Sequence, residues 1–174
     1  LGGGLNDSAY RIAVDAAGCA YVTGLESSTD FPSTPGAFNR GGVHQSANVG
    51  NSWALSSSGL THPLVQTLVA DPASPGTVYA GTPRGVYKSI DGAVTWSGSS
   101  TGLSVSTLSG VSLNSSRTVN ALALDPSAPA TLYAGTKGGV FKSIDGGMTW
   151  TNPSTSLLTT LIRALLIEPG SSSN

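Results

Sequence analysis

Charged side chains are scarce in this sequence. Asp, Glu, Lys and Arg together make up 10% of its 174 residues, where an ordinary soluble domain has about a quarter. The formal net charge is −1, and no run of Lys and Arg provides a basic patch. Nucleic acids and anionic membrane surfaces are recognised by such patches, so we expect no nucleic-acid partner.

Cysteine, histidine and long apolar runs are also scarce. A single cysteine, Cys19, excludes an intrachain disulfide. We expect it to be a small buried residue, because nothing in the sequence brings either histidine, His44 or His62, beside it as a base. Apolar runs such as 121–124 and 164–167 are far too short to cross a bilayer, so no membrane insertion is expected.

What the sequence does contain is a repeated motif of the form Ser-x-Asp/Asn-x-Gly/Ala-x-Ser/Thr-Trp. Its copies occupy 46–53, 89–96 and 143–150. The first two motif tryptophans are 43 residues apart and the last two are 54 apart, but the similar segments that start at Val119 and Ile162 are again 43 apart. The excess of 11 residues therefore precedes Val119, and we place it in the Ser-rich stretch 104–117. A unit of 43 residues matches one four-stranded blade of a β-propeller.

Each unit divides into four short apolar segments joined by turn residues. In the third unit the predicted strands are 119–124, 131–135, 140–143 and 148–151, separated by Asp-Pro and Gly-rich turns, with the motif tryptophan in the fourth strand. The prediction is an all-β fold, a β-propeller segment of antiparallel four-stranded blades, in which residues 1–174 form a single repeat region. Its predicted parts are blade 1 at 9–60, blade 2 at 64–117 with an insertion at 104–117, blade 3 at 118–157, and the first strand of a further blade at 160–168.

Every position of the motif has a structural role in a hairpin between the third and fourth strands. Asp accepts backbone N–H groups across the turn, Gly permits positive φ, the Ser and Thr hydroxyls bond across the loop, and Trp packs on the neighbouring blade. The alternative is an array of calcium-binding or catalytic carboxylates. Asp91 and Asp145 lack the alternating Asp/Asn ligands of a calcium loop. Asn48 replaces the acid in the first copy, so we predict a structural role.

Residues 65–150 contain the pattern DP-x-x-P-x-x-x-YAGT-x-x-GV-[YF]-KS-x-DG-x-x-TW in two units. This pattern resembles the Asp-box repeats of sialidases, sortilin-type receptors and xyloglucanase-like glycoside hydrolases. Residues 1–38 instead resemble the SBBP-type bacterial beta-propeller repeat of large secreted proteins, with Cys19 at a position that is usually Asn. Both resemblances imply propeller blades, and neither implies a particular activity. The SBBP resemblance, together with the low charge and the abundance of Gly, Ser and Thr, leads us to expect a secreted or cell-surface bacterial protein.

The resemblance transfers no catalytic residue to this chain. Sialidases need a converging arginine triad, whereas the arginines here fall on different elements of different units. The Asp that follows the YA-x-T stretch in a catalytic blade of xyloglucanase-like enzymes is replaced by Pro83 and Lys137. A glycoside hydrolase needs two opposed carboxylates, so we expect no catalytic, metal or cofactor site. The arginines are Arg11, Arg40, Arg84, Arg117 and Arg163, and the acids outside the turns are Asp7, Glu26 and Asp30.

Two functions stay open at this point. One is a non-catalytic module for protein or glycan interaction or for structural assembly, with the loops at 25–40 and 104–117 as the candidate binding regions. The other is a fragment of a propeller glycoside hydrolase whose catalytic residues lie outside this chain. Two sets of side chains recur at fixed positions of the units. We expect Gln45, Lys88 and Lys142 to be exposed strand residues or a ligand-binding rim, and His44, Tyr87 and Phe141 to pack between blades.

Three blades do not close a propeller, which usually has four or more. The predicted strand at 160–168 is mostly apolar and needs a cover. Either the next blade of a longer polypeptide starts there, or neighbouring copies of the chain cover it by strand addition. The sequence starts at Leu1 with neither an initiator Met nor a secretion signal, which we interpret as a processed form or a fragment.

Overall fold

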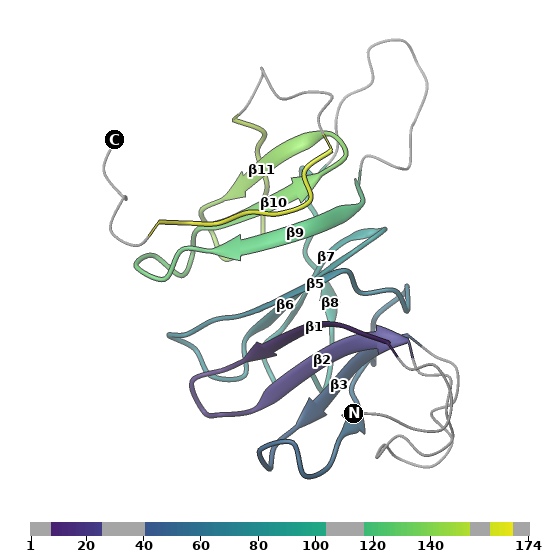
Figure 1. The fold of residues 1–174 in the computed structure, drawn as a ribbon. Helices are drawn as coiled ribbons and strands as arrows, with labels where there is room; N and C mark the ends of the chain where they lie inside the picture. The colour runs from purple at the N-terminus through teal and green to yellow at the C-terminus, as the bar shows by residue number, and fades with distance from the viewer. Residues whose placement is uncertain (1–7, 26–40, 104–116, 154–160, 169–174) are drawn as a thin grey trace.

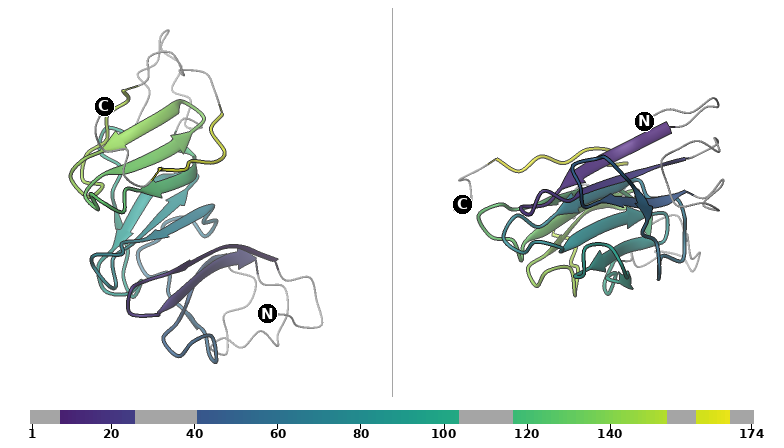
Figure 2. Two further views of the ribbon diagram at one scale, coloured as in Figure 1. Left: turned by 60° about the vertical axis from the view of Figure 1, so that its left-hand side comes forward. Right: turned by 90° about the horizontal axis from the view of Figure 1, so that it is seen from below.

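The protein folds into antiparallel β-sheets that lie side by side in a fan (Figures 1 and 2). The structure, a computed structural model, describes residues 8–25, 41–103, 117–153 and 161–168. The strand order within each sheet follows the chain, as in propeller blades. The strands of the first sheet are β1 (Ser8–Val14), β2 (Ala20–Leu25), β3 (Gly42–Ser46) and β4 (Ala54–Leu55). Those of the second are β5 (Thr67–Ala70), β6 (Val78–Thr82), β7 (Gly85–Ser89) and β8 (Ser97–Gly98).

The third sheet contains β9 (Val119–Leu124), β10 (Leu132–Thr136) and β11 (Gly139–Ser143). Its fourth member is reduced to one residue, Thr151, which exchanges two backbone hydrogen bonds of 2.8 Å with Lys142. The pair occupies the place where β8 meets β7 in the second sheet, through Lys88 and Ser97. The prediction of an all-β chain of antiparallel four-stranded sheets is therefore confirmed. Within the described ranges there is no α-helix.

Aspartates close the turn between the first and second strands, as their place before Pro or small residues predicts. The Asp15 carboxylate accepts the backbone N–H groups of Ala17 and Cys19, each at 3.0 Å. Asp71 and Asp125 repeat the bond to the residue two positions ahead, at 2.8 and 2.9 Å. The same local chemistry therefore reverses the chain at the same end of every sheet.

The hydrophobic cores lie between the sheets and not within them. Between the first and second sheets, Tyr21 and Val43 pack with Leu68, Ala80 and Trp96. Between the second and third sheets the corresponding cluster includes Tyr79, Val86, Leu122, Phe141 and Trp150. Each sheet is thus stabilised mainly by its neighbours, which is the arrangement of a repeat protein.

The motif tryptophans lie just before the fourth strands, which corrects the prediction that they belong to them. The backbone N–H of Trp96 donates to the Ser58 carbonyl, and that of Trp150 donates to the Thr101 carbonyl, both at 2.8 Å. These bonds run to the segment that ends the preceding unit, so the tryptophan backbone pairs with another sheet. Because the hydrogen-bond partner of the tryptophan backbone lies in the preceding unit, a strand prediction made within one unit assigns the tryptophan to the wrong place.

The segment 161–168 lies alongside the third sheet in Figure 1 and pairs with no strand of the described chain. Ile162 donates one backbone hydrogen bond of 3.1 Å to the Thr136 carbonyl, and Asn120 Nδ2 donates to the Ile162 carbonyl at 3.2 Å. Residues 161–168 of the strand predicted at 160–168 therefore form no strand in this structure. A ladder would need a second strand beside the segment, and the further blade stays a prediction.

Candidate functional site

Four polar residues share one register and face one pocket. Tyr10, Gln66, Asn120 and Arg163 each stand five residues before the acid of the first turn of their unit, or before Glu168, its equivalent in the C-terminal segment. Tyr10 and Asn120 lie in β1 and β9, Gln66 directly precedes β5, and Arg163 lies in the unpaired segment 161–168. All four line a single pocket of about 580 Å³. The first strands lie innermost in a propeller blade, so we call the surface formed by these four residues the axial surface. The other lining residues are Arg11, Leu64, Lys137 and Leu161.

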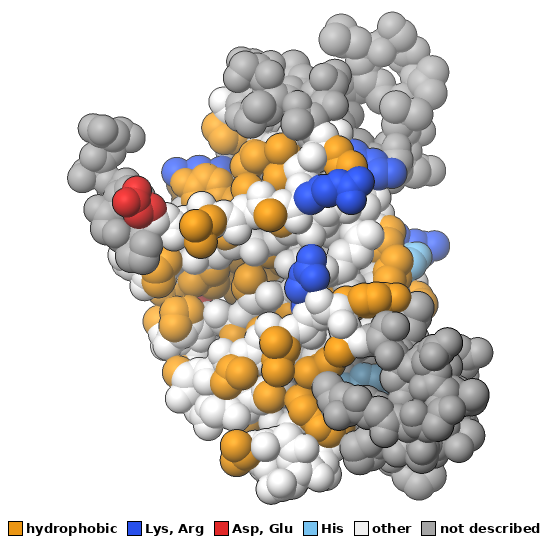
Figure 3. Space-filling view, in the orientation of Figure 1, with side chains coloured by type: hydrophobic (Ala, Val, Ile, Leu, Met, Phe, Trp, Pro, Cys, Tyr) orange, Lys and Arg blue, Asp and Glu red, His pale blue; other side chains and the backbone are white. Residues whose placement is uncertain are grey.

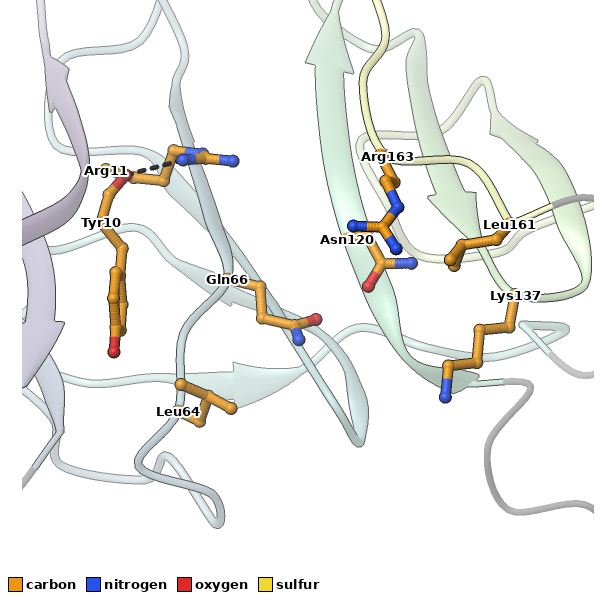
Figure 4. Close-up of a pocket in the computed structure, with 8 residues that line it drawn as sticks. All are labelled: Tyr10, Arg11, Leu64, Gln66, Asn120, Lys137, Leu161 and Arg163. Atoms are coloured by element: carbon orange, nitrogen blue, oxygen red, sulfur yellow. Dashed lines mark hydrogen bonds between the residues drawn. The ribbon is translucent and has the colours of Figure 1, made fainter.

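Figure 4 shows how the two sides of the pocket are built. Tyr10 and Gln66 extend from the first and second units on one side, and Asn120 and Arg163 from the third sheet and the C-terminal segment on the other (Figure 4). Arg11 Nη1 donates to the Tyr10 carbonyl at 2.7 Å. The Gln66 Oε1 atom is buried and has no hydrogen-bond partner in the described residues. The pocket therefore presents amide and guanidinium donors, while the unsatisfied acceptor of Gln66 is closed to solvent.

The charge of this pocket is positive. Its lining includes Arg11, Lys137 and Arg163 and contains neither Asp nor Glu among the described residues. Lys and Arg side chains are seen across this face of the molecule in Figure 3. Such a surface can hold the hydroxyl groups of a sugar or the carboxylate of an acidic ligand. The lining residues cannot by themselves perform the two-carboxylate hydrolysis of a glycosidic bond.

The motif acids lie away from the axial surface and are committed to their turns. Asp91 accepts the Thr95 hydroxyl at 2.5 Å, the Thr95 backbone N–H at 2.9 Å and the Ser89 hydroxyl at 2.8 Å. The Thr95 and Ser89 bonds lower the pKa of Asp91 to about 2. Asp145 makes the same bonds with Thr149 and Ser143, and its pKa is also about 2. The predicted hydrogen bonding across the motif turn is confirmed.

The turn backbone also follows the prediction. The residues after the acid take positive φ, at 67° for Gly146 and 83° for Gly147. In the second unit the corresponding values are 71° for Gly92 and 68° for Ala93. The predicted packing of the tryptophan is confirmed as well, because Trp96 Nε1 donates to the Ser56 carbonyl of the first unit at 2.8 Å.

Asp15 is the acid that joins the first two blades. Tyr21 Oη donates to Asp15 Oδ2 at 2.9 Å, and the Gly76 backbone N–H of the second unit donates to the same oxygen at 3.2 Å. Burial raises the pKa of Asp15, but the hydrogen bonds from Tyr21, Cys19 and Gly76 outweigh it and leave the pKa below its usual value. The charged form is held by structural bonds, so this carboxylate is no candidate for proton transfer.

The arginines do not gather at one site in the described part of the chain. Arg11 and Arg163 line the 580 Å³ pocket at the axial surface, which we call the axial pocket. Arg84 and Arg117 line a second pocket of about 620 Å³, together with His62, Pro83 and Tyr87. Arg40, Asp7, Glu26 and Asp30 lie outside the described residues, as do most of the loops at 25–40 and 104–117.

No group of three or more His, Cys, Asp or Glu side chains in the described ranges could hold a metal ion. Nor do those ranges include a helix long and apolar enough to span a membrane. Cys19 is half-buried and packs against the core between the first two sheets, as a small apolar residue would.

The position shared by His44, Tyr87 and Phe141 is buried in all three units, and the predicted packing between blades is confirmed for Tyr87 and Phe141. Tyr87 and Phe141 belong to the two cores between sheets. His44 is 5% exposed and lies across from Val22 and Leu55 on neighbouring strands. Burial lowers the pKa of His44.

The axial surface is the feature that sequence reasoning missed. Its signal was present, since the spacing of five residues to the turn acid is constant, but the residue type changes in every unit. A search for repeated residue types passes over a position where only the geometry repeats.

A scan of protein-family models found no match, and no curated protein matches the chain. Similar solved structures exist. One is the GH74 xyloglucanase from Xanthomonas campestris, with a TM-score of 0.58 at 16% sequence identity over 85% of this chain. Another is a GH74 enzyme from Niastella koreensis, with a TM-score of 0.57 at 22% identity over 83% of this chain. Both are β-propeller proteins.

The chain has the β-propeller fold. It spans only 24% and 22% of the length of these two solved structures. At such low identity the likeness extends to the fold and to nothing further. The predicted β-propeller is confirmed, whereas the finer resemblance to Asp-box and SBBP repeats stays a prediction.

Proposed function

We propose that the chain is a non-catalytic β-propeller section of a secreted or cell-surface bacterial protein, which binds a glycan or protein ligand at its axial surface. The composition of the axial pocket carries this proposal. Donors from Asn120 and Arg163 and the Tyr10 ring surround one space without a carboxylate among the described lining residues. Stacking on an aromatic ring and hydrogen bonding to amides are the usual means of holding a polar ligand in a concave site.

Binding and hydrolysis are measured on the same protein. The chain is titrated with neutral and acidic oligosaccharides, including xyloglucan and sialoside fragments, and product release is followed in parallel. We expect saturable binding without product. Asn120→Ala and Arg163→Ala each remove a donor, which weakens binding about tenfold, the equivalent of one hydrogen bond of ordinary strength.

The matched control is Arg84→Ala, because Arg84 lies in the other pocket. This variant should bind as the unchanged chain does. Hydrolysis by the chain itself, or equal loss of affinity in all three variants, contradicts the proposal.

A second candidate is a section of a propeller glycoside hydrolase with its catalytic residues outside this chain. The likeness to two GH74 structures, of which this chain spans about a quarter, favours it. This candidate predicts an acidic pair on the inner strands of additional blades in a longer parent sequence. An open reading frame that contains further blades without such a pair contradicts it.

A further inference from the structure

A pair of cross-strand neighbours recurs in the middle of each sheet. A tyrosine on the second strand stands directly opposite a long polar side chain on the third strand, and we call such a pair a clasp. The clasps are Tyr21 with Gln45, Tyr79 with Lys88, and Tyr133 with Lys142.

The clasp of the second blade holds the motif turn of the third. Tyr79 Oη and Lys88 Nζ both donate to the Gly146 carbonyl, each at 3.1 Å. Lys88 Nζ also lies 5.2 Å from the centre of the Tyr79 ring, within the range of a cation–π contact. Lys88 is thus half-buried against the next blade, which corrects the prediction that it is an exposed strand residue.

The clasp of the first blade meets the equivalent turn of the second. A Cβ atom on Gly92 would lie 3.2 Å from Gln45 Nε2 and 3.8 Å from Tyr21 Oη. Gly92 and Gly146 hold the same place in the motif, directly after its acid. Two successive joints therefore use the same position of the turn against the same pair of strands.

The clasp of the third blade is assembled in the same way, but it holds no motif turn in the described residues. Tyr133 shares a pocket with 165–168. Hydrogen bonds from Ser127 and, with them, the charge of Lys142 lower the pKa of Asp125. Lys142 Nζ lies 5.5 Å from the centre of the Tyr133 ring. No hydrogen bond joins Tyr133 Oη or Lys142 Nζ to another residue in the part of the chain that the structure describes. Tyr133 is half-buried, whereas Tyr21 and Tyr79 are 0% and 1% exposed.

The segment 161–168 lies where the first strand of a fourth blade belongs. A Cβ atom on Gly81 would lie 2.7 Å from Val119 Cγ1, on the first strand of the next blade. A Cβ atom on Gly135, one unit later, would lie 2.5 Å from Ile162 Cγ2. Ile162 follows Val119 by 43 residues, so the contact between successive blades is repeated at the third blade.

We infer that Tyr133 and Lys142 bind the motif turn of a fourth blade, of which residues 161–168 are the first strand. The partner is a three-stranded antiparallel sheet with glycine after the acid of its motif turn. The two clasp donors converge on the carbonyl of that glycine, as Tyr79 and Lys88 converge on Gly146.

A second copy of this chain fits less well than such a sheet. Its first blade brings its own first strand, β1, which would compete for the place held by 161–168. Its motif turn has Val49 where the other two copies have glycine. A Cβ atom at Gly146 would already lie 3.3 Å from Lys88 Nζ, so a valine at this position requires the clasp lysine to shift away from the turn.

One contact of the earlier joints is not repeated. Ser56 Oγ donates to the Ala93 carbonyl at 2.9 Å and Ser99 Oγ to the Gly147 carbonyl at 2.5 Å. Pro153 stands at this place in the third unit and has no hydroxyl. The joint to a fourth blade therefore depends more heavily on Tyr133 and Lys142 than the earlier joints depend on their clasps.

The test extends the chain with its own sequence. Residues 1–169 are followed by a second copy of residues 127–153, which supplies the second to fourth strands and a motif turn in register. We expect hydrogen exchange at the amides of 161–168 to slow at least about tenfold, because these amides enter a ladder. The double variant Tyr133→Phe/Lys142→Met should lower the melting temperature of the extended chain by about 4–8 °C and that of the original chain hardly at all.

The matched control is Tyr79→Phe/Lys88→Met, which removes an existing joint and lowers the melting temperature of both chains. Unchanged exchange at 161–168, or an equal effect of the Tyr133/Lys142 variant on both chains, overturns the inference.

If the extended chain does not fold, a synthetic 127–153 peptide is titrated into the original full chain. Saturable binding that the Tyr133/Lys142 variant abolishes supports the inference, and absence of binding overturns it. Self-association of the original chain that the same variant abolishes identifies a second copy as the occupant and overturns it as well.

Discussion

At the scale of single residues, the motif acid acts through hydrogen bonds that an amide can also make. In the first unit Asn48 Oδ1 accepts the Ser46 hydroxyl at 3.0 Å and the Ser52 backbone N–H at 2.9 Å. Its Nδ2 then donates to the Ser52 hydroxyl at 2.8 Å, where Asp145 instead accepts from Thr149. Only the direction of one bond is reversed, and a hydroxyl serves either direction.

The variants Asp145→Asn and Asp145→Ala separate geometry from charge. We expect Asp145→Asn to melt close to the unchanged chain at neutral pH, and Asp145→Ala to melt about 2–4 °C lower because the turn loses its acceptors. The folded pKa of Asp145 is about 2, below its ordinary value of 3.8. Its stabilising contribution is therefore present above pH 3.8 and lost as the pH falls toward 2, and Asp145→Asn removes that loss.

Thermal melts between pH 2 and 7 measure both effects. Asn48→Asp is the reciprocal variant and should add the same acid sensitivity to the first unit. A melting temperature of Asp145→Asn as low as that of Asp145→Ala would show that the charge is required.

His44 gives the fold a second, separate dependence on pH. The unfolded chain binds a proton at the ordinary pKa of 6.5, whereas burial lowers the folded pKa of His44. The unfolded state therefore binds more protons as the pH falls below 6.5, and stability decreases on acidification by at most about 1.4 kcal/mol per pH unit. His44→Phe, which copies Phe141 of the third unit, should remove this slope in urea titrations at pH 4.5 to 7.5.

The control for this experiment is His62→Gln, which removes the other histidine and measures how much of the slope belongs to it. A slope that persists in His44→Phe, or disappears in His62→Gln, assigns the proton elsewhere.

At the scale of elements, a glycine on the second strand lets the first strand of the next blade approach. Gly81 has no room for a side chain, because a Cβ atom would lie 2.4 Å from Thr67 Cγ2 and 2.7 Å from Val119 Cγ1. Both neighbours belong to paired strands, although the register of β9 and β10 shifts next to Val119, so neither can move away independently. The close approach is thus fixed between the second and third blades.

Gly81 and Gly135 hold equivalent positions, but Gly81 faces a residue of a paired strand and Gly135 faces a residue of an unpaired segment. Alanine substitutions at the two positions therefore show how firmly each neighbour is held. Gly81→Ala should cost about 1–3 kcal/mol of unfolding free energy through overpacking. Gly135→Ala should cost less, because Ile162 lies on a segment without strand pairing that can shift. Urea denaturation measures the two costs, and faster hydrogen exchange at 161–168 in Gly135→Ala identifies the shift. Equal costs with unchanged exchange would show that 161–168 is held as firmly as β9.

At the scale of the whole molecule, the sequence predicts the strands of each sheet well and the contacts between neighbouring sheets poorly. The period of 43 residues and the Asp and Gly turns are local signals, so they predict the strand order and the motif hairpin. The place of Trp150 before the fourth strand, and the bond from Lys88 to Gly146, depend on residues of a neighbouring blade. The axial surface was missed for a related reason, since Gln66 and Asn120 share a position and not a residue type.

The contacts between two neighbouring blades come from both of their units. Each unit contains one set of residues that contacts the following unit and another set that contacts the preceding unit. The clasp tyrosine extends toward the following unit, as Tyr79 does to Gly146, and the motif tryptophan toward the preceding one, as Trp96 does to Ser56. An in-frame duplication or deletion of one 43-residue unit in a gene therefore supplies or removes both sets together. Blade number can change in evolution by unequal recombination, without compensating substitutions at the joints that remain.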